Sequence, residues 1–132
     1  MQVDLLTAAT ATNGVPSGAT AGAKMLGHTD VATLFVKSVA GSGTMTASLR
    51  LWGYHIYTAT WYPLGTGAAN TKGLINGGVA LAEDIANDLR HAELVSGLFR
   101  IDRVYLEVVS IGGTATALTA VLDCVPAESR TM

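Results

Sequence analysis

The sequence predicts an all-β fold: an antiparallel β-sandwich of the jelly-roll or Greek-key type, with at most one short helix. Three observations support this class. Apolar and polar residues alternate with a period of two in several segments; these segments are rich in Val, Thr, Tyr, Ile and Trp; and Gly, Ser or Pro separate them. About six or seven such strands can each bury one face when two sheets pack together. The 132 residues match the size of one domain.

Residues 1–27 are predicted to be an extended N-terminal arm or loop. From residue 7 onward this segment is mostly Ala, Thr, Gly and Ser, and it contains the turn-forming pair Asn13-Gly14. Its uncharged, apolar composition differs from that of free disorder and favours an arm that orders on a neighbouring subunit. The alternative is a surface loop held against its own domain. Before residue 7, the apolar residues Val3, Leu5 and Leu6 are able to form a short first strand.

Residues 28–126 are predicted to form the sandwich. Between residues 31 and 39 apolar side chains occupy both faces, which indicates a central strand that is covered on each side. The turn Gly41-Ser42-Gly43 then predicts a hairpin to residues 45–51, which alternate strictly. Residues 54–62 fit a half-buried strand, and Pro63 ends it because proline cannot donate to a ladder.

The second half of the sandwich begins after a glycine-rich connection over residues 65–78. Residues 79–90 carry apolar side chains at helical spacing, which predicts a short helix, and the alternative is a loop that runs into a strand over residues 89–95. Alternation over residues 103–110 and 114–125 predicts another antiparallel hairpin. Residues 127–132 form a polar C-terminal tail.

Composition favours a subunit of an assembly. Charged residues make up 14% of the chain, against a typical share of roughly 25%, so Ala, Thr, Ser and Gly must cover much of the surface. The alternative is a small monomer rich in Ala and Gly. A net charge of −2 with scattered basic residues argues against a nucleic-acid partner. The short apolar runs and the start of the chain predict neither a membrane span nor a signal peptide.

No catalytic, cofactor-binding or metal-binding residue is predicted, so we expect no enzyme and no cofactor. The histidines at 28, 55 and 91 lack partners at metal-ligand spacing, and Ser42 lies in a turn rather than a nucleophile elbow. The glycine patterns near residues 22 and 65 are incomplete as nucleotide loops. The acidic group Glu83, Asp84 and Asp88 fits a solvated helix face, and Cys124 fits a small buried side chain.

Aromatic and apolar residues are the candidate contacts. Trp52 and Trp61 are predicted to pack in the core or between subunits, and the alternative is a stacking platform for sugar rings. Tyr105, flanked by charged residues, is the best candidate for an exposed contact. The predicted interface residues are Val3, Leu5, Leu6, Val15, Trp52, Trp61, Tyr62 and Tyr105.

A succession of motifs carries a resemblance to a known family. The Gly41-Ser42-Gly43 turn is followed by Leu-Arg-Leu-Trp-Gly-Tyr at 49–54, Trp-Tyr-Pro-Leu-Gly at 61–65, and the run from Arg103 to Thr114. This succession resembles small β-sandwich structural proteins of tailed-bacteriophage virions, above all the capsid decoration, or cement, proteins. It covers about half of the chain, residues 31–65 and 97–125.

The resemblance implies a non-enzymatic protein on the exterior of the capsid, made in the host cytoplasm. Such a protein binds the major capsid protein as a homo-oligomer, often a trimer, and holds neighbouring shell subunits together. Two alternatives remain. One is a tail or head-fibre component of the virion, and the other is a carbohydrate-binding β-sandwich module that uses Trp52, Trp61 or Tyr105.

Overall fold

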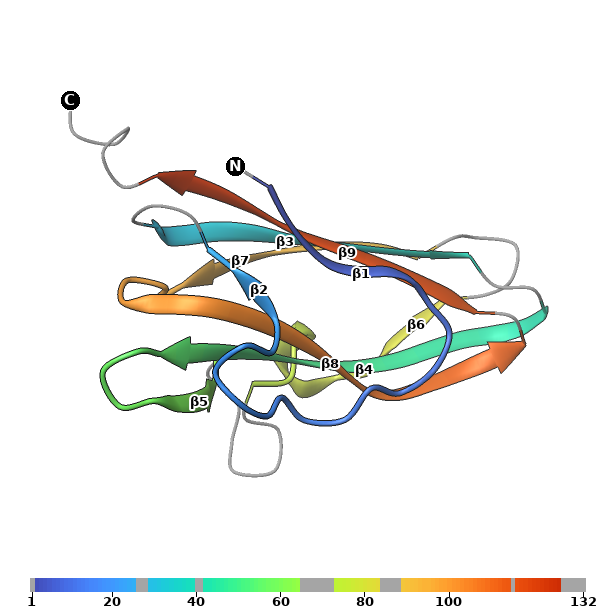
Figure 1. Cartoon of the computed structure of the whole chain (residues 1–132). Coiled ribbons are helices and arrows are strands. Elements are labelled where there is room, and N and C mark those ends of the chain that lie inside the picture. The colour runs from blue at the N-terminus through green and yellow to red at the C-terminus, as the bar shows by residue number, and fades with distance from the viewer. Residues whose placement is uncertain are drawn as a thin grey trace.

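The computed structural model describes residues 2–25, 29–39, 42–64, 73–83, 89–114 and 116–126. In these residues the chain forms strands and one short 3-10 turn, η1 (Asn76–Gly78), and two antiparallel sheets pack face to face (Figure 1). The predicted all-β sandwich is therefore confirmed. Within the same residues, no helix has the length and apolar character needed to cross a membrane.

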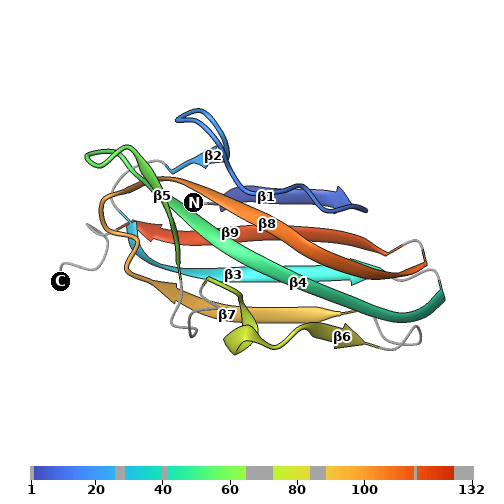
Figure 2. The ribbon, with the colours of Figure 1, turned by 90° about the horizontal axis from the view of Figure 1, so that it is seen from below.

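The first sheet has the order β1-β9-β3-β7. It contains β1 (Gln2–Ala9), β9 (Ala117–Pro126), β3 (Thr29–Val39) and β7 (Arg90–Ser96). The second sheet has the order β2-β8-β4-β5 and contains β2 (Ala23–Lys24), β8 (Ile101–Thr114), β4 (Ser42–His55) and β5 (Thr60–Pro63). The short β6 (Leu81–Glu83) also pairs with β4. Figure 2 shows the long strands β4 and β8 crossing the first sheet at an angle.

Strand pairing follows the pattern of a jelly roll. β1 pairs with β9, β2 with β8, β3 with β7 and β4 with β5, all antiparallel. The chain is thus one long hairpin, folded back at the turn of residues 56–59, and its two arms wrap around a common core. Within the first sheet, pairing of β3 with β9 joins the β1–β9 pair to the β3–β7 pair, and within the second sheet, pairing of β4 with β8 joins the β2–β8 pair to the β4–β5 pair. Of the two topologies left open by the sequence, the structure has the jelly roll.

The core lies between the sheets and is built from alternate residues of each strand. Leu34 on β3 lies opposite Leu122 on β9, and Leu51 on β4 lies opposite Leu106 on β8, and all four are almost completely buried. Alternation places these leucines inward and their neighbours outward. Apolar burial of this extent is the main source of stability in the sandwich.

Two predicted hairpins are wrong. β3 and β4 follow each other in the chain but lie in different sheets, and the same is true of β8 and β9. In a jelly roll the partner of a strand comes from the opposite arm of the long hairpin, so the connection between sequence neighbours crosses from one sheet to the other. Ser42, predicted to lie in a hairpin turn, begins β4 after such a crossing.

The predicted helix over residues 79–90 is also wrong. The described residues of this segment include β6 and the first residue of β7, and the alternative, a strand over residues 89–95, is confirmed by β7. β6 pairs with β4 and β7 pairs with β3, which provides partners for their backbone hydrogen bonds, and Leu81 and Leu89 are buried. These tertiary contacts outweigh the weak preference for a helix that a few apolar residues at helical spacing provide. Residues 84–88 lie outside the described residues.

The prediction for residues 31–39 is confirmed in part. β3 is a central strand between β9 and β7. Only one of its faces is covered, however, because Phe35 on the other face is 45% exposed. The outer face of the first sheet is therefore open in the described structure.

The N-terminal segment belongs largely to the sandwich. β1 is a strand of the first sheet, and β2 pairs with β8 in the second. Between them, residues 10–22 run along the β8 side of the second sheet, which is the surface-loop alternative stated above (Figure 1). The predicted tail at 127–132 lies outside the described residues.

Candidate interaction surfaces

The predicted interface residues do not gather on one surface. Val3 and Leu6 are buried in the core, and Leu5 packs against it. Val15 lies on the N-terminal segment with its side chain exposed. Trp52, Trp61 and Tyr105 lie together on the outer face of the second sheet, whereas Tyr62 points to the other side of β5.

The register of the strands brings Trp52, Trp61 and Tyr105 together, with Tyr54 beside them. Trp52 on β4 is opposite Tyr105 on β8, and Tyr54 on β4 is opposite Trp61 on β5. The ring centroids are 5.2 Å apart for Tyr54 and Trp61, and 6.3 Å apart for Trp61 and Tyr105, in tilted or edge-on geometry. Such pairs are favourable beyond the area they bury. The aromatic residues therefore stabilise the outer face of this sheet.

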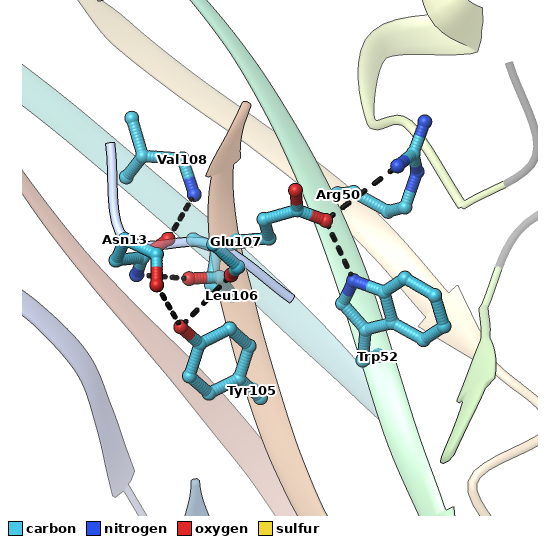
Figure 3. A network of polar contacts seen from close by, with 8 residues as sticks. Asn13, Arg50, Trp52, Tyr105, Leu106, Glu107 and Val108 are labelled. Carbon is cyan, nitrogen blue, oxygen red and sulfur yellow. Dashed lines mark hydrogen bonds and ion pairs between the residues drawn. The ribbon is translucent and has the colours of Figure 1, made fainter. Parts of the chain in front are cut away.

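A buried carboxylate lies beside this aromatic group. Glu107 is 7% exposed although it faces outward on β8. Its Oε1 accepts a 2.9 Å hydrogen bond from Nε1 of Trp52 and lies 3.5 Å from a guanidinium nitrogen of Arg50 (Figure 3). A buried carboxylate is costly without such partners, so the indole N–H and the guanidinium make this position tolerable for a charge.

Asn13 attaches the N-terminal segment to the edge of β8. Its side-chain N–H donates to the carbonyl of Leu106 at 3.1 Å, and its side-chain oxygen accepts from the N–H of Val108 at 2.7 Å (Figure 3). Because the side-chain amide pairs with two backbone groups of an edge strand, it replaces one residue of a neighbouring strand. Satisfying these groups protects the edge from pairing with another chain.

Tyr105 and Trp61 hold the same segment further along. The hydroxyl of Tyr105 donates to the carbonyls of Asn13 and Gly14, at 3.1 and 3.0 Å, and Nε1 of Trp61 donates to the carbonyl of Gly18 at 3.0 Å. Burial, with a smaller effect of Glu107, raises the pKa of Tyr105. A sugar bound here would meet rings whose polar atoms already bond within the chain.

A second apolar surface lies at one end of the sandwich, and we call it the loop end. It consists of Ile56 and Tyr57 from the β4–β5 turn and Phe99 and Arg100 from the β7–β8 turn, and Tyr57 is 73% exposed. The Arg100 guanidinium carbon lies 5.7 Å from the ring centroid of Tyr57 and 5.1 Å from that of Phe99. The contact of Arg100 with Tyr57 links the two turns, and its contact with Phe99 lies within the β7–β8 turn. A hollow of about 270 Å³ lies beside them.

Tyr62 lies close to the loop end. Its hydroxyl donates to Oγ1 of Thr58 at 3.1 Å, and its ring lies edge-on to His55 with centroids 6.3 Å apart. These contacts order the β4–β5 turn while leaving part of the Tyr62 ring exposed.

The third surface is the outer face of the first sheet, which we call the open face. Its apolar side chains are Phe35, Leu94, Ala92 and Val121, and Leu94 is 70% exposed. Part of this face is hollowed to a volume of about 550 Å³. Exposed apolar side chains that lie together on one face make this surface a candidate for contact with another molecule.

Groups that could carry chemistry have structural partners. Nδ1 of His55 lies 2.9 Å from Oγ1 of Thr58, and Nε2 of His91 lies 2.6 Å from Oε1 of Glu93. In the described part of the chain, no group of three or more His, Cys, Asp or Glu could hold a metal ion. Burial raises the pKa of the Cys124 thiol, which disfavours the reactive thiolate.

Other motifs singled out in the sequence fall elsewhere. Lys24 lies on β2 with its side chain exposed. The side chains of Ser42 and of the acidic group Glu83, Asp84 and Asp88 are outside the described residues, as are His28 and the glycine pattern that starts at residue 65.

Four residues of these surfaces were missed by sequence reasoning. Phe35 and Leu94 had a usable signal, since each alternates in sequence with inward-facing residues of its own strand. Asn13 and Glu107 had none, because their roles depend on backbone and side-chain groups far away in the chain.

Comparisons of the chain with protein-family models, curated proteins and solved structures find no match.

Proposed function

We propose that this protein is a non-enzymatic structural protein of a tailed-phage virion, which binds the outer surface of the capsid as a homo-oligomer and stabilises the shell. Its partner is the major capsid protein. The resemblance carried by residues 31–65 and 97–125 supports the virion assignment and favours a trimer. The low content of charged residues agrees with a subunit that is covered by neighbours.

The observation that carries the proposal is the presence of two separate apolar surfaces. The open face displays Phe35 and Leu94, and the loop end displays Tyr57 and Phe99. A protein that both self-associates and holds shell subunits needs two contact surfaces of different kinds. We assign the open face to contact between copies and the loop end to the shell, where exposed aromatic side chains serve as anchors.

The jelly roll gives weaker support. This topology is found in viral capsid and lectin domains, and a fold by itself does not determine function. Contacts repeated over a shell bind by avidity, so a small contact at each loop end is sufficient for attachment.

The test is attachment to capsid shells. We would mix the purified protein with shells of the encoding phage that lack it, sediment them, and measure the bound fraction. Tyr57→Ser/Phe99→Ser should lower attachment at least tenfold because each truncation at an interface anchor costs about 1 kcal/mol or more. Val79→Ser is the control, since Val79 is 66% exposed and outside both surfaces.

The outcomes separate the alternatives. If Val79→Ser still attaches to shells and Tyr57→Ser/Phe99→Ser does not, the proposal is supported. Failure of the wild-type protein to bind shells contradicts it, and labelling of virions at the tail or at head fibres with an antibody against this chain would favour the fibre alternative.

A further inference from the structure

We infer that the open face is a self-complementary surface on which a second copy of this chain docks around a two-fold axis. The residues that support this lie in register on four strands, and both their charges and their apolar side chains are placed for such an axis. The inference rests on the self-association in the proposed function but not on attachment to a virion, and it replaces the trimer with a two-fold pair.

Two adjacent rows of side chains make the centre of this face. One row runs Asp4, Val121, Phe35, Ala92 from β1 to β7, and the row beside it runs Gln2, Asp123, Thr33, Leu94. Phe35 and Val121 are neighbours across β3 and β9, and they occupy the middle of the sheet. The centre is therefore apolar, as in the core of a protein interface.

The charges lie at opposite corners of the face. Asp4 and Asp123 are on β1 and β9, whereas Lys37 and Arg90 are opposite each other on β3 and β7, one row beyond Phe35. All four side chains are exposed. Among the described residues, neither Lys37 nor Arg90 forms an ion pair. The acidic corner and the basic corner are thus separate, and in the acidic corner Oδ1 of Asp4 accepts a 3.1 Å hydrogen bond from the side-chain amide of Gln2.

The register places the midpoint between these corners at the Phe35–Val121 pair. Consider a two-fold axis that lies in the plane of contact and crosses, at a right angle and at this midpoint, the line that joins the two corners. Such an axis exchanges the corners, so the acidic corner of each copy meets the basic corner of the other. Strand spacings of about 4.8 Å and rises of about 3.3 Å per residue place Leu94 close to the same axis. Leu94 would therefore meet its equivalent in the second copy.

Association through the β7 edge of this sheet is less favourable. The edge strand β7 turns two ionisable side chains, His91 and Glu93, toward the sandwich, and Glu93 Oε1 also accepts from the backbone N–H of Asn76 at 2.8 Å. Inward-pointing charged residues on an edge strand disfavour the addition of another strand. Packing of face on face avoids this obstacle.

Four strands are only about 19 Å wide, so the contact falls in the small class of interfaces and the pair should dissociate on dilution. The experiment is sedimentation-equilibrium ultracentrifugation of the full chain over a range of concentrations. Lys37→Glu/Arg90→Glu makes both corners acidic, and Asp4→Lys/Asp123→Lys makes both basic. Each variant should dissociate about tenfold more readily, or more, because like charges then oppose each other.

An equimolar mixture of the two variants provides the decisive measurement. In a mixed pair each acidic corner again meets a basic corner, so the mixture should associate with nearly the wild-type affinity. The control is Lys24→Glu/Val79→Glu/Ala80→Glu, which changes the net charge by the same amount as Lys37→Glu/Arg90→Glu, at exposed residues outside the open face and the loop end. Circular dichroism would establish that each variant is folded.

Recovery of association in the mixture, with no loss in the control, supports the two-fold pair. A wild-type protein that is monomeric at all concentrations, a trimer unaffected by these substitutions, or a control that dissociates as readily as the variants would overturn it. Shell attachment is measured separately. A monomer that binds shells rejects this inference together with the self-association in the proposed function, but leaves shell attachment standing. A pair that does not bind shells rejects the proposed attachment and leaves this inference standing.

Discussion

The side-chain oxygen of Asn13 accepts a 2.7 Å hydrogen bond from the backbone N–H of Val108, a residue 95 positions later in the chain. The same amide donates to the carbonyl of Leu106. One side chain thus completes the edge of β8 beyond the point where β2 ends, and it holds residues 10–22 against the second sheet.

Asn13→Ala should destabilise the protein by about 1–3 kcal/mol, because two partly buried backbone groups lose their partners. Asn13→Asp should also destabilise it, since a carboxylate retains the acceptor for Val108 but places an acceptor against the Leu106 carbonyl. Urea unfolding measures both. Thr12→Ala is the control, as Thr12 is the exposed neighbour in the chain; equal effects at 12 and 13 would contradict the role of the amide.

Gly22→Ala should be more destabilising than Gly18→Ala. Both glycines have positive φ, +75° and +78°, so alanine costs about 1–2 kcal/mol at either position. At Gly22 a Cβ would also collide with the carbonyl oxygen of Val104, whereas at Gly18 it would meet no atom within 4 Å. Thermal unfolding of the two variants compares them directly, and a Gly18→Ala variant as unstable as Gly22→Ala would refute the close approach.

Leu34→Ala and Leu94→Ala form a matched pair on neighbouring strands. Leu34 is fully buried in the core, so truncation should cost about 2–5 kcal/mol. Leu94 is 70% exposed on the open face, so its truncation should change the stability of the monomer by less than about 0.5 kcal/mol. Chemical unfolding at low protein concentration tests this; a large loss for Leu94→Ala would mean that this side chain supports the sandwich itself.

The free energy of unfolding should decrease at alkaline pH because of the ionisation of Tyr105. Its pKa is raised above the ordinary value of 10.0, so the unfolded chain ionises first, and the stabilisation present below pH 10 is lost as pH rises through the folded pKa. Tyr105→Phe lacks the hydroxyl that donates to Asn13 and Gly14 and should be about 1 kcal/mol less stable near pH 8.

The deficit of Tyr105→Phe relative to the wild type should therefore shrink above pH 10. The free energy of unfolding of both proteins, measured from pH 8 to 11, gives this difference directly. A deficit that stays constant or grows over this range would show that ionisation of Tyr105 is not linked to folding.

The N-terminal segment illustrates how far sequence reasoning reaches. Its composition predicted an extended stretch without helix, and residues 10–22 contain no strand. Composition did not reveal that Val3 and Leu6 fill the core, because β1 obtains its partner from β9, at the other end of the chain. Deleting residues 1–27 would therefore remove two strands of the sandwich, β1 and β2, so an arm contact is better tested with Val15→Ser, where the side chain is 62% exposed.

The alternation of residues determined by itself that the chain is an antiparallel sandwich and which side chains of β4 and β8 face inward. A period of two reports local side-chain direction, and this direction is a property of consecutive residues. The sequence also located the central strand β3, where apolar residues occupy positions on both faces.

Only the tertiary structure decided which strands pair, that β3 and β4 separate into different sheets, and where Trp52, Trp61 and Tyr105 lie. These features depend on contacts between residues far apart in the chain, which no local pattern encodes. The same holds for the open face: alternation places Phe35 on the outer face of its strand, but Phe35 and Asp123 share one surface only because β9 lies beside β3.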